Sequence, residues 1–135
     1  MDVGYSGTPL WKKLGLKPGL TAQLVGAPSD WSVGGEPTGV EWVDESHPSA
    51  DLIVTFIRSA AQVSTMLETL GERVYPAGMV WVAWPRKAAG HVSDVDENLI
   101  RDTALGLGLV DVKVAAMDAD WSGLKLVWRK TNRTR

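Results

Sequence analysis

Cysteine is absent from this chain of 135 residues. Disulfide bonds, thiol catalysis and zinc sites built on cysteine are therefore excluded, and small secreted domains usually depend on such bridges. No apolar run approaches the roughly 20 residues of a membrane-spanning helix. Residues 1–6 lack the basic and apolar stretches of a secretion signal. We therefore expect a cytoplasmic protein with no membrane partner.

Positive charge is also scarce. The 14 lysines and arginines stand against 16 aspartates and glutamates, a net charge of −2, so the composition does not favour a nucleic-acid binder. The charge is uneven, because residues 30–51 hold six acids and no base whereas residues 125–135 hold five bases. Two such surfaces could meet across a contact with a partner protein or a second copy. The alternative is two ordinary solvated surfaces.

Patterns typical of catalysis or metal binding are few. The only histidines are His47 and His91, and neither has a second ligand at helical spacing, so we predict no metal site. Either could act as a general base near neutral pH, but both are expected in surface loops. No serine lies in a Gly-x-Ser-x-Gly pattern. The sequence contains no catalytic constellation, and we predict no catalytic residue.

The composition is that of one globular domain, with 44% hydrophobic and 22% charged residues. Residues 51–57 form a nearly continuous apolar run rich in β-branched side chains, which predicts a strand covered on both faces, as in a parallel sheet. Hydrophobic periodicity predicts further strands over 21–26, 40–43, 79–84, 110–116 and 124–128. Helices are expected over 10–14, 59–74 and 93–107.

Local signals place the ends of these helices. Thr8 is expected to cap the first helix, with Pro9 at its first position. Capping boxes are expected at the other two starts, Ser59 with Gln62 and Ser93 with Asp96. The glycines expected to end helices are Gly15, Gly106 and Gly108.

Together these elements predict a small Rossmann-like three-layer α/β sheet, mostly parallel with a C-terminal antiparallel hairpin. Strand–helix–strand units require parallel strands, whereas the alternating pattern of the last two strands indicates an antiparallel pair near a sheet edge. We expect a single domain over residues 1–130 and a flexible basic tail over residues 131–135.

Four segments resemble the class I S-adenosylmethionine-dependent methyltransferases. Residues 17–26 are similar to the approach to that family's first glycine-rich motif, residues 51–54 to its central strand, and residues 75–82 to the turn and strand after its fourth helix. Asp44 follows the second strand, where such enzymes place an acid on the cofactor ribose. The resemblance implies the spatial strand order 2-1-3-4-6-5, with the last strand antiparallel.

The segment that would hold the cofactor departs from this pattern. A cofactor loop needs glycines directly after the first strand and a helix whose N-terminus faces the ligand. Here the strand is followed by Gly26-Ala27-Pro28, in which Pro28 removes a backbone donor, and no amphipathic helix follows. The chain also lacks one strand–helix unit and a substrate cap. We therefore expect no cofactor, with S-adenosylmethionine as the alternative.

A second resemblance covers nearly the whole chain. It rests on four groups of residues, Tyr5-Ser6-Gly7-Thr8-Pro9-Leu10 with Lys13-Leu14-Gly15 and Lys17-Pro18-Gly19, Trp84-Pro85-Arg86-Lys87, Leu109-Val110-Asp111-Val112-Lys113, and Trp121-Ser122-Gly123-Leu124-Lys125-Leu126-Val127. These are similar to a family of small bacterial proteins, common in high-GC Gram-positive bacteria, that is classed as a domain of unknown function. The resemblance implies no particular activity.

In doubly wound sheets, ligands bind beyond the carboxyl ends of the strands. The candidate ligand-binding residues predicted there are Gly26, Asp44, Arg58, Ser59, Trp84, Arg86 and Lys87. Arg86 and Lys87 could hold a phosphate or carboxylate, and Ser59 at a helix start would add backbone N–H groups. The alternative is that Arg86 and Lys87 belong to a solvated loop and pair with the acidic 30–51 segment.

Three weaker candidates have simple structural alternatives. Residues 6–8 could form an anion-binding turn or only a helix cap. Asp118 and Asp120 could recruit a divalent cation or only be solvated in a loop. Trp31 and Trp121 could stack a ligand or partner, or fold back onto the sheet.

Two functions remain after these exclusions. The first is a non-enzymatic Rossmann-like protein that binds a partner protein or itself. The second is a binder of a small anionic or nucleotide-like ligand, including a degenerate methyltransferase.

Overall fold

The computed structural model describes residues 7–135. Its centre is one six-stranded sheet with the order β2-β1-β3-β4-β6-β5, which is the order that the resemblance to the methyltransferases implies. The bounds of the strands are β1 Thr21–Val25, β2 Glu41–Trp42, β3 Leu52–Phe56, β4 Met79–Pro85, β5 Leu109–Ala116 and β6 Trp121–Trp128. β1 to β4 pair in parallel, and β6 is antiparallel to both β4 and β5.

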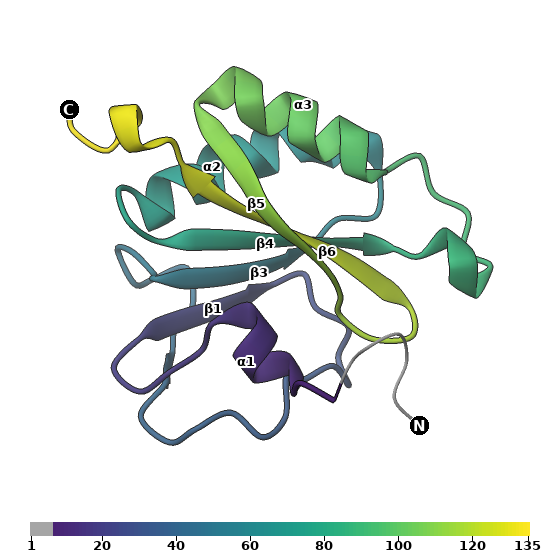
Figure 1. The fold of residues 1–135 in the computed structure, drawn as a ribbon, viewed down its shortest axis with the longest axis horizontal. Coiled ribbons are helices and arrows are strands. Elements are labelled where there is room, and N and C mark those ends of the chain that lie inside the picture. Colours follow the sequence, from purple (N-terminus) through teal and green to yellow (C-terminus); the bar gives the residue numbers. More distant parts are fainter. Residues whose placement is uncertain (1–6) are drawn as a thin grey trace.

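Helices cover the two faces of the sheet unequally (Figure 1). α2 (Val63–Val74) and α3 (Glu97–Leu107) lie together on one face, whereas the short α1 (Leu10–Leu14) lies on the other. Three short 3-10 turns complete the elements, over Ala60–Gln62, Lys87–Ala89 and Lys130–Asn132. Within residues 7–135 no helix is long and apolar enough to cross a membrane.

The core has two parts, one on each side of the sheet. All five residues of β3 are buried, so alternate side chains enter the two parts. Ile53 packs on the side of α2 and α3, whereas Val54 and Phe56 pack on the side of α1. On the α1 side, Trp81 is fully buried and its indole N–H donates to the Leu14 carbonyl at 3.0 Å. This bond satisfies the one polar atom of the indole inside the core.

Two of the predicted helix starts need correction. Thr8 does not cap α1, because Pro9 itself is extended (ψ 151°) and its carbonyl accepts from Lys12 and Lys13 N–H at 3.1 Å. α3 is capped by the Asp96 carboxylate, which accepts from Leu99 N–H at 2.9 Å. The expected start at Ser93 is therefore too early, since the Ser93 hydroxyl accepts from Val95 N–H in the turn before the helix.

Two of the three predicted helix-ending glycines and one of the two predicted capping boxes are confirmed. Gly15 and Gly108 end their helices at φ 92° and 93°, where glycine has no steric penalty. Gly106 lies inside α3 and does not end it. The Gln62 side chain accepts from the Ser59 backbone N–H at 3.2 Å, as the predicted capping box requires.

The segment between β1 and β3 contains no helix and only the two-residue strand β2. Arg73 of α2 holds its second half in place. The Arg73 guanidinium donates to the side-chain oxygen of Gln23, at 3.0 Å from Nε and 2.6 Å from Nη2, and to the His47 carbonyl at 2.6 Å. Gln23 is 4% exposed, so Arg73 satisfies a buried amide as well as anchoring the loop.

Residues 131–135, predicted to be a flexible tail, make specific contacts in the structure. The Asn132 amide donates to the Gly108 carbonyl at 3.0 Å, and Arg133 donates to the Trp128 carbonyl at 2.9 Å. Arg135 lies 3.8 Å from the centre of the Tyr75 ring and forms two hydrogen bonds with Glu72. The flexibility of this tail stays a prediction.

We predict that Gly78→Ala strongly destabilises the fold. A Cβ at this position would lie 2.8 Å from the Asp51 carbonyl oxygen and 2.8 Å from both Val74 Cβ and the Val74 carbonyl oxygen. Relief requires backbone movement, so we expect a loss of roughly 3 kcal/mol in the free energy of unfolding, measured with urea. Gly106→Ala is the control, because a Cβ there meets no atom within 4 Å. It should stabilise α3 by up to about 1 kcal/mol, and equal effects of the two changes would contradict this account.

The Glu72–Arg135 ion pair predicts a pH dependence of stability. The hydrogen bonds from Arg135, 2.8 and 2.6 Å long, hold the pKa of Glu72 below its usual 4.5. A depressed pKa in the folded state means that the stabilisation is complete above pH 4.5 and is lost as the pH falls through the folded value. Both side chains are more than half exposed, so the effect is small.

Glu72→Gln should therefore lower the unfolding free energy slightly at pH 7 and leave it unchanged at low pH. Urea unfolding across this range measures the difference between the two proteins. A difference that persists or grows in acid would show that Glu72 contributes through packing alone.

Candidate functional site

The carboxyl ends of the parallel strands and the β5–β6 turn form one edge of the molecule, and this edge contains two clefts. The larger has a volume of about 700 Å³ and lies between the start of α1, the segment after β1 and the β5–β6 turn. The smaller, about 460 Å³, lies beside Arg58 and His91. Asp120 and Trp121 line both clefts, so the start of β6 separates them.

The aromatic wall of this edge is built on Phe56, the last residue of β3. The Trp31 ring meets Phe56 at a centroid distance of 4.8 Å and an interplanar angle of 70°. Trp121 meets the same phenyl ring at 5.0 Å and 87°. Both are edge-to-face contacts, worth about 0.5–1.5 kcal/mol each beyond burial. Trp31 and Trp121 therefore fold back onto the sheet, and both still line the larger cleft.

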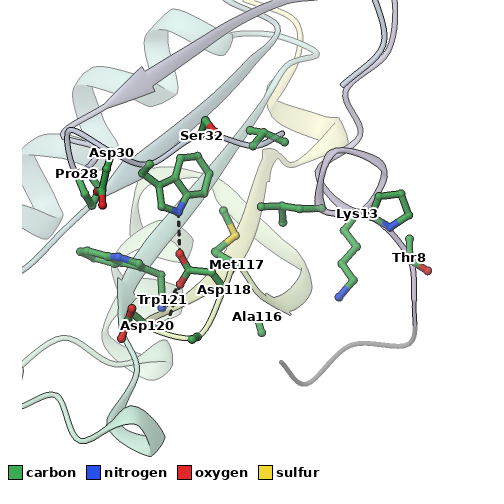
Figure 2. A pocket seen from close by; sticks show the side chains of 15 residues that line it. Thr8, Lys13, Pro28, Asp30, Ser32, Ala116, Met117, Asp118, Asp120 and Trp121 are labelled. Carbon is green, nitrogen blue, oxygen red and sulfur yellow. Dashed lines mark hydrogen bonds between the residues drawn. The ribbon is translucent and has the colours of Figure 1, made fainter. Parts of the chain in front are cut away.

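Asp118 organises the turn opposite Trp31. One carboxylate oxygen accepts from the backbone N–H groups of Asp120 and Trp121 at 2.7 and 2.9 Å. The other accepts from the Trp31 indole N–H at 2.9 Å (Figure 2). Three donors thus converge on one carboxylate and join two segments that are 87 residues apart. These bonds give Asp118 a structural role. The role considered from the sequence was binding of a divalent cation together with Asp120.

Arg58 is an exposed residue that lies beside the end of β1. Its guanidinium donates to the Gly26 carbonyl at 3.0 Å and lies 5.1 Å from the centre of the Trp121 ring. Gly26 has φ +72°, and a Cβ there would come within 3.2 Å of the Phe56 carbonyl oxygen. A glycine is therefore required where β1 ends, for a close approach between neighbouring strands.

The other predicted cations meet backbone or solvent. The Arg86 guanidinium donates to the Asp118 carbonyl at 3.1 Å, and the Arg86 backbone N–H donates to the Asp120 carbonyl at 2.8 Å. Lys87 is exposed in the following 3-10 turn. His91, in the same loop, pairs with the Asp120 carboxylate at 2.9 Å.

Two predicted site residues lie elsewhere. Asp44 is an exposed residue beyond the short β2, where its carbonyl accepts from Arg73. Hydrogen bonds from the Ser46 hydroxyl and backbone lower the pKa of Asp44. Trp84 is 7% exposed and packs in the core on the side of α2 and α3. The structure thus brings together Gly26 and Arg58, with Ser59 next in the chain and Arg86 bonded across the β5–β6 turn.

The larger cleft carries excess negative charge. Asp30, Asp118 and Asp120 line it together with one lysine, Lys13. Figure 2 shows the three carboxylates and Trp121 on one side of the cleft and Lys13 with Thr8 on the other. Among the ion pairs within residues 7–135, none involves Asp30 or Asp118. No group of three potential metal ligands occurs in this part of the chain.

Sequence reasoning missed the link between Trp31 and Asp118. Trp31 was noted as a loop tryptophan and Asp118 as half of an acidic pair, but no sequence signal connects residues so far apart. The sequence predicts Arg58 as a ligand contact, whereas in the structure its guanidinium contacts Gly26 and Trp121. An arginine directly after a buried strand is compatible with both interpretations.

No protein-family model matches the chain, and no curated protein matches its sequence. Solved structures do match its fold. A protein from Thermoplasma acidophilum described as a putative methyltransferase superposes with a TM-score of 0.56 at 9% identity, covering 93% of this chain and 76% of its own. The ribosomal protein L11 methylase of Lactobacillus delbrueckii subsp. bulgaricus gives 0.55 at 14%, covering 89% and 75%.

A third structure, a protein of the NADB-Rossmann superfamily from Streptococcus agalactiae, gives a TM-score of 0.54 at 12% identity and covers 99% of this chain and 73% of its own. The chain therefore has a Rossmann-like fold of the methyltransferase type, as the sequence predicted. At these identities the likeness concerns the fold alone.

This fold raises the question of whether S-adenosylmethionine fits the residues present. Cofactor loops of Rossmann-like folds bring a glycine-rich backbone and a helix N-terminus up to the ligand. Here the segment after β1 forms no helix, and its Trp31 packs against Phe56. Arg58 donates to the carbonyl at the end of β1. The residues at this edge do not fit the cofactor.

We predict that Asp118→Ala loosens this edge. The change removes acceptors for three hydrogen bonds, two from the backbone and one from Trp31. Bonds to a charged acceptor are worth about 1.5–3 kcal/mol each at most and do not add fully, so we expect a loss of roughly 2–3 kcal/mol in urea unfolding. Asp120→Ala is the control in the same turn, because within residues 7–135 its carboxylate bonds to His91 alone, and it should cost less than about 1 kcal/mol. The reverse order would rule out Asp118 as the organiser of the turn.

Proposed function

We propose that this chain is a non-enzymatic binding domain that retains a methyltransferase-like fold without a site for S-adenosylmethionine and acts through contact with a partner protein. The observation that carries the proposal is the position of Arg58. Its guanidinium lies beside the end of β1, bonded to the Gly26 carbonyl and 5.1 Å from the centre of the Trp121 ring. The bond and the cation–π contact stabilise this arrangement within the chain.

The absence of a helix after β1 supports the same conclusion. A dinucleotide-sized ligand is held at this point of the fold by backbone N–H groups at a helix N-terminus. In this chain the backbone after β1 passes through Pro28 and turns at Trp31, whose backbone N–H donates to the Pro28 carbonyl at 2.9 Å. The backbone N–H of Trp31 is thus bonded within the segment, and Pro28 has no backbone N–H to donate.

A protein contact suits the surface that replaces the cofactor site. The larger cleft at this edge is open and lined by the tryptophans Trp31 and Trp121 together with carboxylates. Half-buried tryptophans are over-represented where proteins meet, because they provide a large rigid contact area together with a polar N–H. Self-association through the same edge is the variant of this proposal in which the partner is a second copy.

The rival function, binding of a small anionic ligand, has less support from the geometry. Arg58 and Arg86 both donate to backbone carbonyls, so neither presents its full planar fork to an anion. Lys87 alone is left at the predicted site, and a single exposed lysine is a weak anion receptor. Membership of the bacterial family that the sequence resembles stays a prediction and adds no activity to either function.

The first test is calorimetric titration with S-adenosylmethionine and S-adenosylhomocysteine, followed by thermal unfolding in their presence. We expect neither heat nor a rise in Tm at ligand concentrations far above those that saturate a methyltransferase, because binding to the folded state alone would stabilise it. The L11 methylase of similar fold serves as the positive control. Saturable binding that Arg58→Glu abolishes would overturn the proposal, since Arg58 would then be a ligand contact.

A further inference from the structure

We infer that the larger cleft receives an arginine side chain from an extended segment of a partner protein. This inference rests on the proposed function and names the chemistry of the partner. Three features of the cleft support it: its aromatic wall, its three carboxylates and its size.

The aromatic wall is suited to a guanidinium. Trp121 already accepts one, since Arg58 lies 5.1 Å from the centre of its ring. Arg58 lines the smaller cleft and does not line the larger one, so the part of the indole that faces the larger cleft is left for another group. Trp31 lines the same cleft and is fixed in orientation by its bond to Asp118. Planar cations stack on such rings, and arginine does so more often than lysine.

The carboxylates supply the charge that such a cation needs. Asp30 is exposed and, within residues 7–135, takes part in no ion pair. Asp118 accepts only from neutral N–H donors, so its charge is not neutralised by them. Asp120 has His91 as its partner, and a histidine is charged only when protonated. Against these three acids the cleft places Lys13 on its far side.

The size of the cleft is compatible with a segment of a protein chain. A volume of about 700 Å³ lies within the range of ligand pockets and has room for one arginine side chain together with its neighbours in a chain. The walls come from three separate parts of the sequence, around residues 8–13, 28–33 and 116–121. Such a trough admits an extended backbone, with the arginine directed at Trp121 and Asp30.

The inference is tested by calorimetry with short end-blocked peptides in which arginine, lysine or glutamate alternates with serine. We expect measurable binding of the arginine peptide, binding about threefold weaker for lysine, and none for glutamate. The indole N–H signals of Trp31 and Trp121 in a two-dimensional nitrogen–proton spectrum should shift on titration, and those of Trp11 and Trp42 should not. An arginine peptide that binds no better than the glutamate peptide would overturn the inference.

A matched pair of variants separates the cleft from general attraction to an acidic protein. Asp30→Lys and Glu45→Lys change the net charge equally, and both positions are exposed, but only Asp30 lines the cleft. We expect Asp30→Lys to weaken the arginine peptide about tenfold and Glu45→Lys to change it less than about twofold. Equal weakening would reduce the binding to non-specific attraction and overturn the inference.

The remaining outcomes are also decisive. If arginine amide alone binds as tightly as the peptide, the cleft is a small-molecule site and no partner segment is needed. If the peptide fails while S-adenosylmethionine also fails to bind, this inference is wrong and the proposed function stands. If S-adenosylmethionine binds, the proposed function fails whatever the peptide does.

Discussion

The ring of Phe56 is the physical centre of the edge that holds the candidate site. It ends the most buried strand of the sheet and is itself 3% exposed, and it receives the edges of Trp31 and Trp121 from two directions. The same two tryptophans connect to the rest of the edge, because Trp31 donates to Asp118 and Trp121 lies 5.1 Å from the Arg58 guanidinium. In a sheet of this topology a cofactor would be expected at the same place, where this chain has packed aromatic side chains.

The fold does not need a cofactor loop after β1, because its stability comes from the buried central strands. β3 and β4 are buried on both faces, and the side chains of Ile53, Val54 and Trp81 are inaccessible to solvent. Each Å² of apolar surface removed from water stabilises the fold by roughly 25 cal/mol. This stabilisation does not depend on which side chains lie at the carboxyl edge of the sheet. A chain can therefore retain the strand order of a methyltransferase while the loop after β1 loses its helix. Similarity of fold and loss of the cofactor site are compatible for this reason.

Sequence patterns predicted the parts of the structure that depend on local periodicity. The apolar run at residues 51–57, the amphipathic helix ending near Val74 and the alternation in the last two strands predicted a mostly parallel sheet with a terminal antiparallel pair. The strand order was implied by the resemblance to the methyltransferases. The helix ends were less accurate, because Pro9 and Asp96 compete with nearby Thr8 and Ser93 for the same role and tertiary contacts decide between them. The candidate site was predicted least well. Gly26 and Arg58 were placed at the correct edge, whereas Asp44 lies apart because β2 has only two residues and ends too soon to bring Asp44 to the edge.

Arg58 and Trp31 give the physical reason why sequence patterns predict the candidate site poorly. An arginine or tryptophan in a loop carries the same sequence signal whether it binds a ligand, a partner or its own chain, because all three use the same stacking and hydrogen-bonding groups. The difference lies in which groups are already satisfied. Arg58 has its carbonyl acceptor and its aromatic ring within the molecule, whereas the carboxylate of Asp30 has no cation among the described residues. A carboxylate without an internal partner beside a half-buried indole is free to bind a partner, whereas a cation bonded within the chain contributes to the fold. By that criterion the contacts of Arg58 stabilise the structure, and the cleft between Asp30 and Trp121 is the place where the proposed partner would bind.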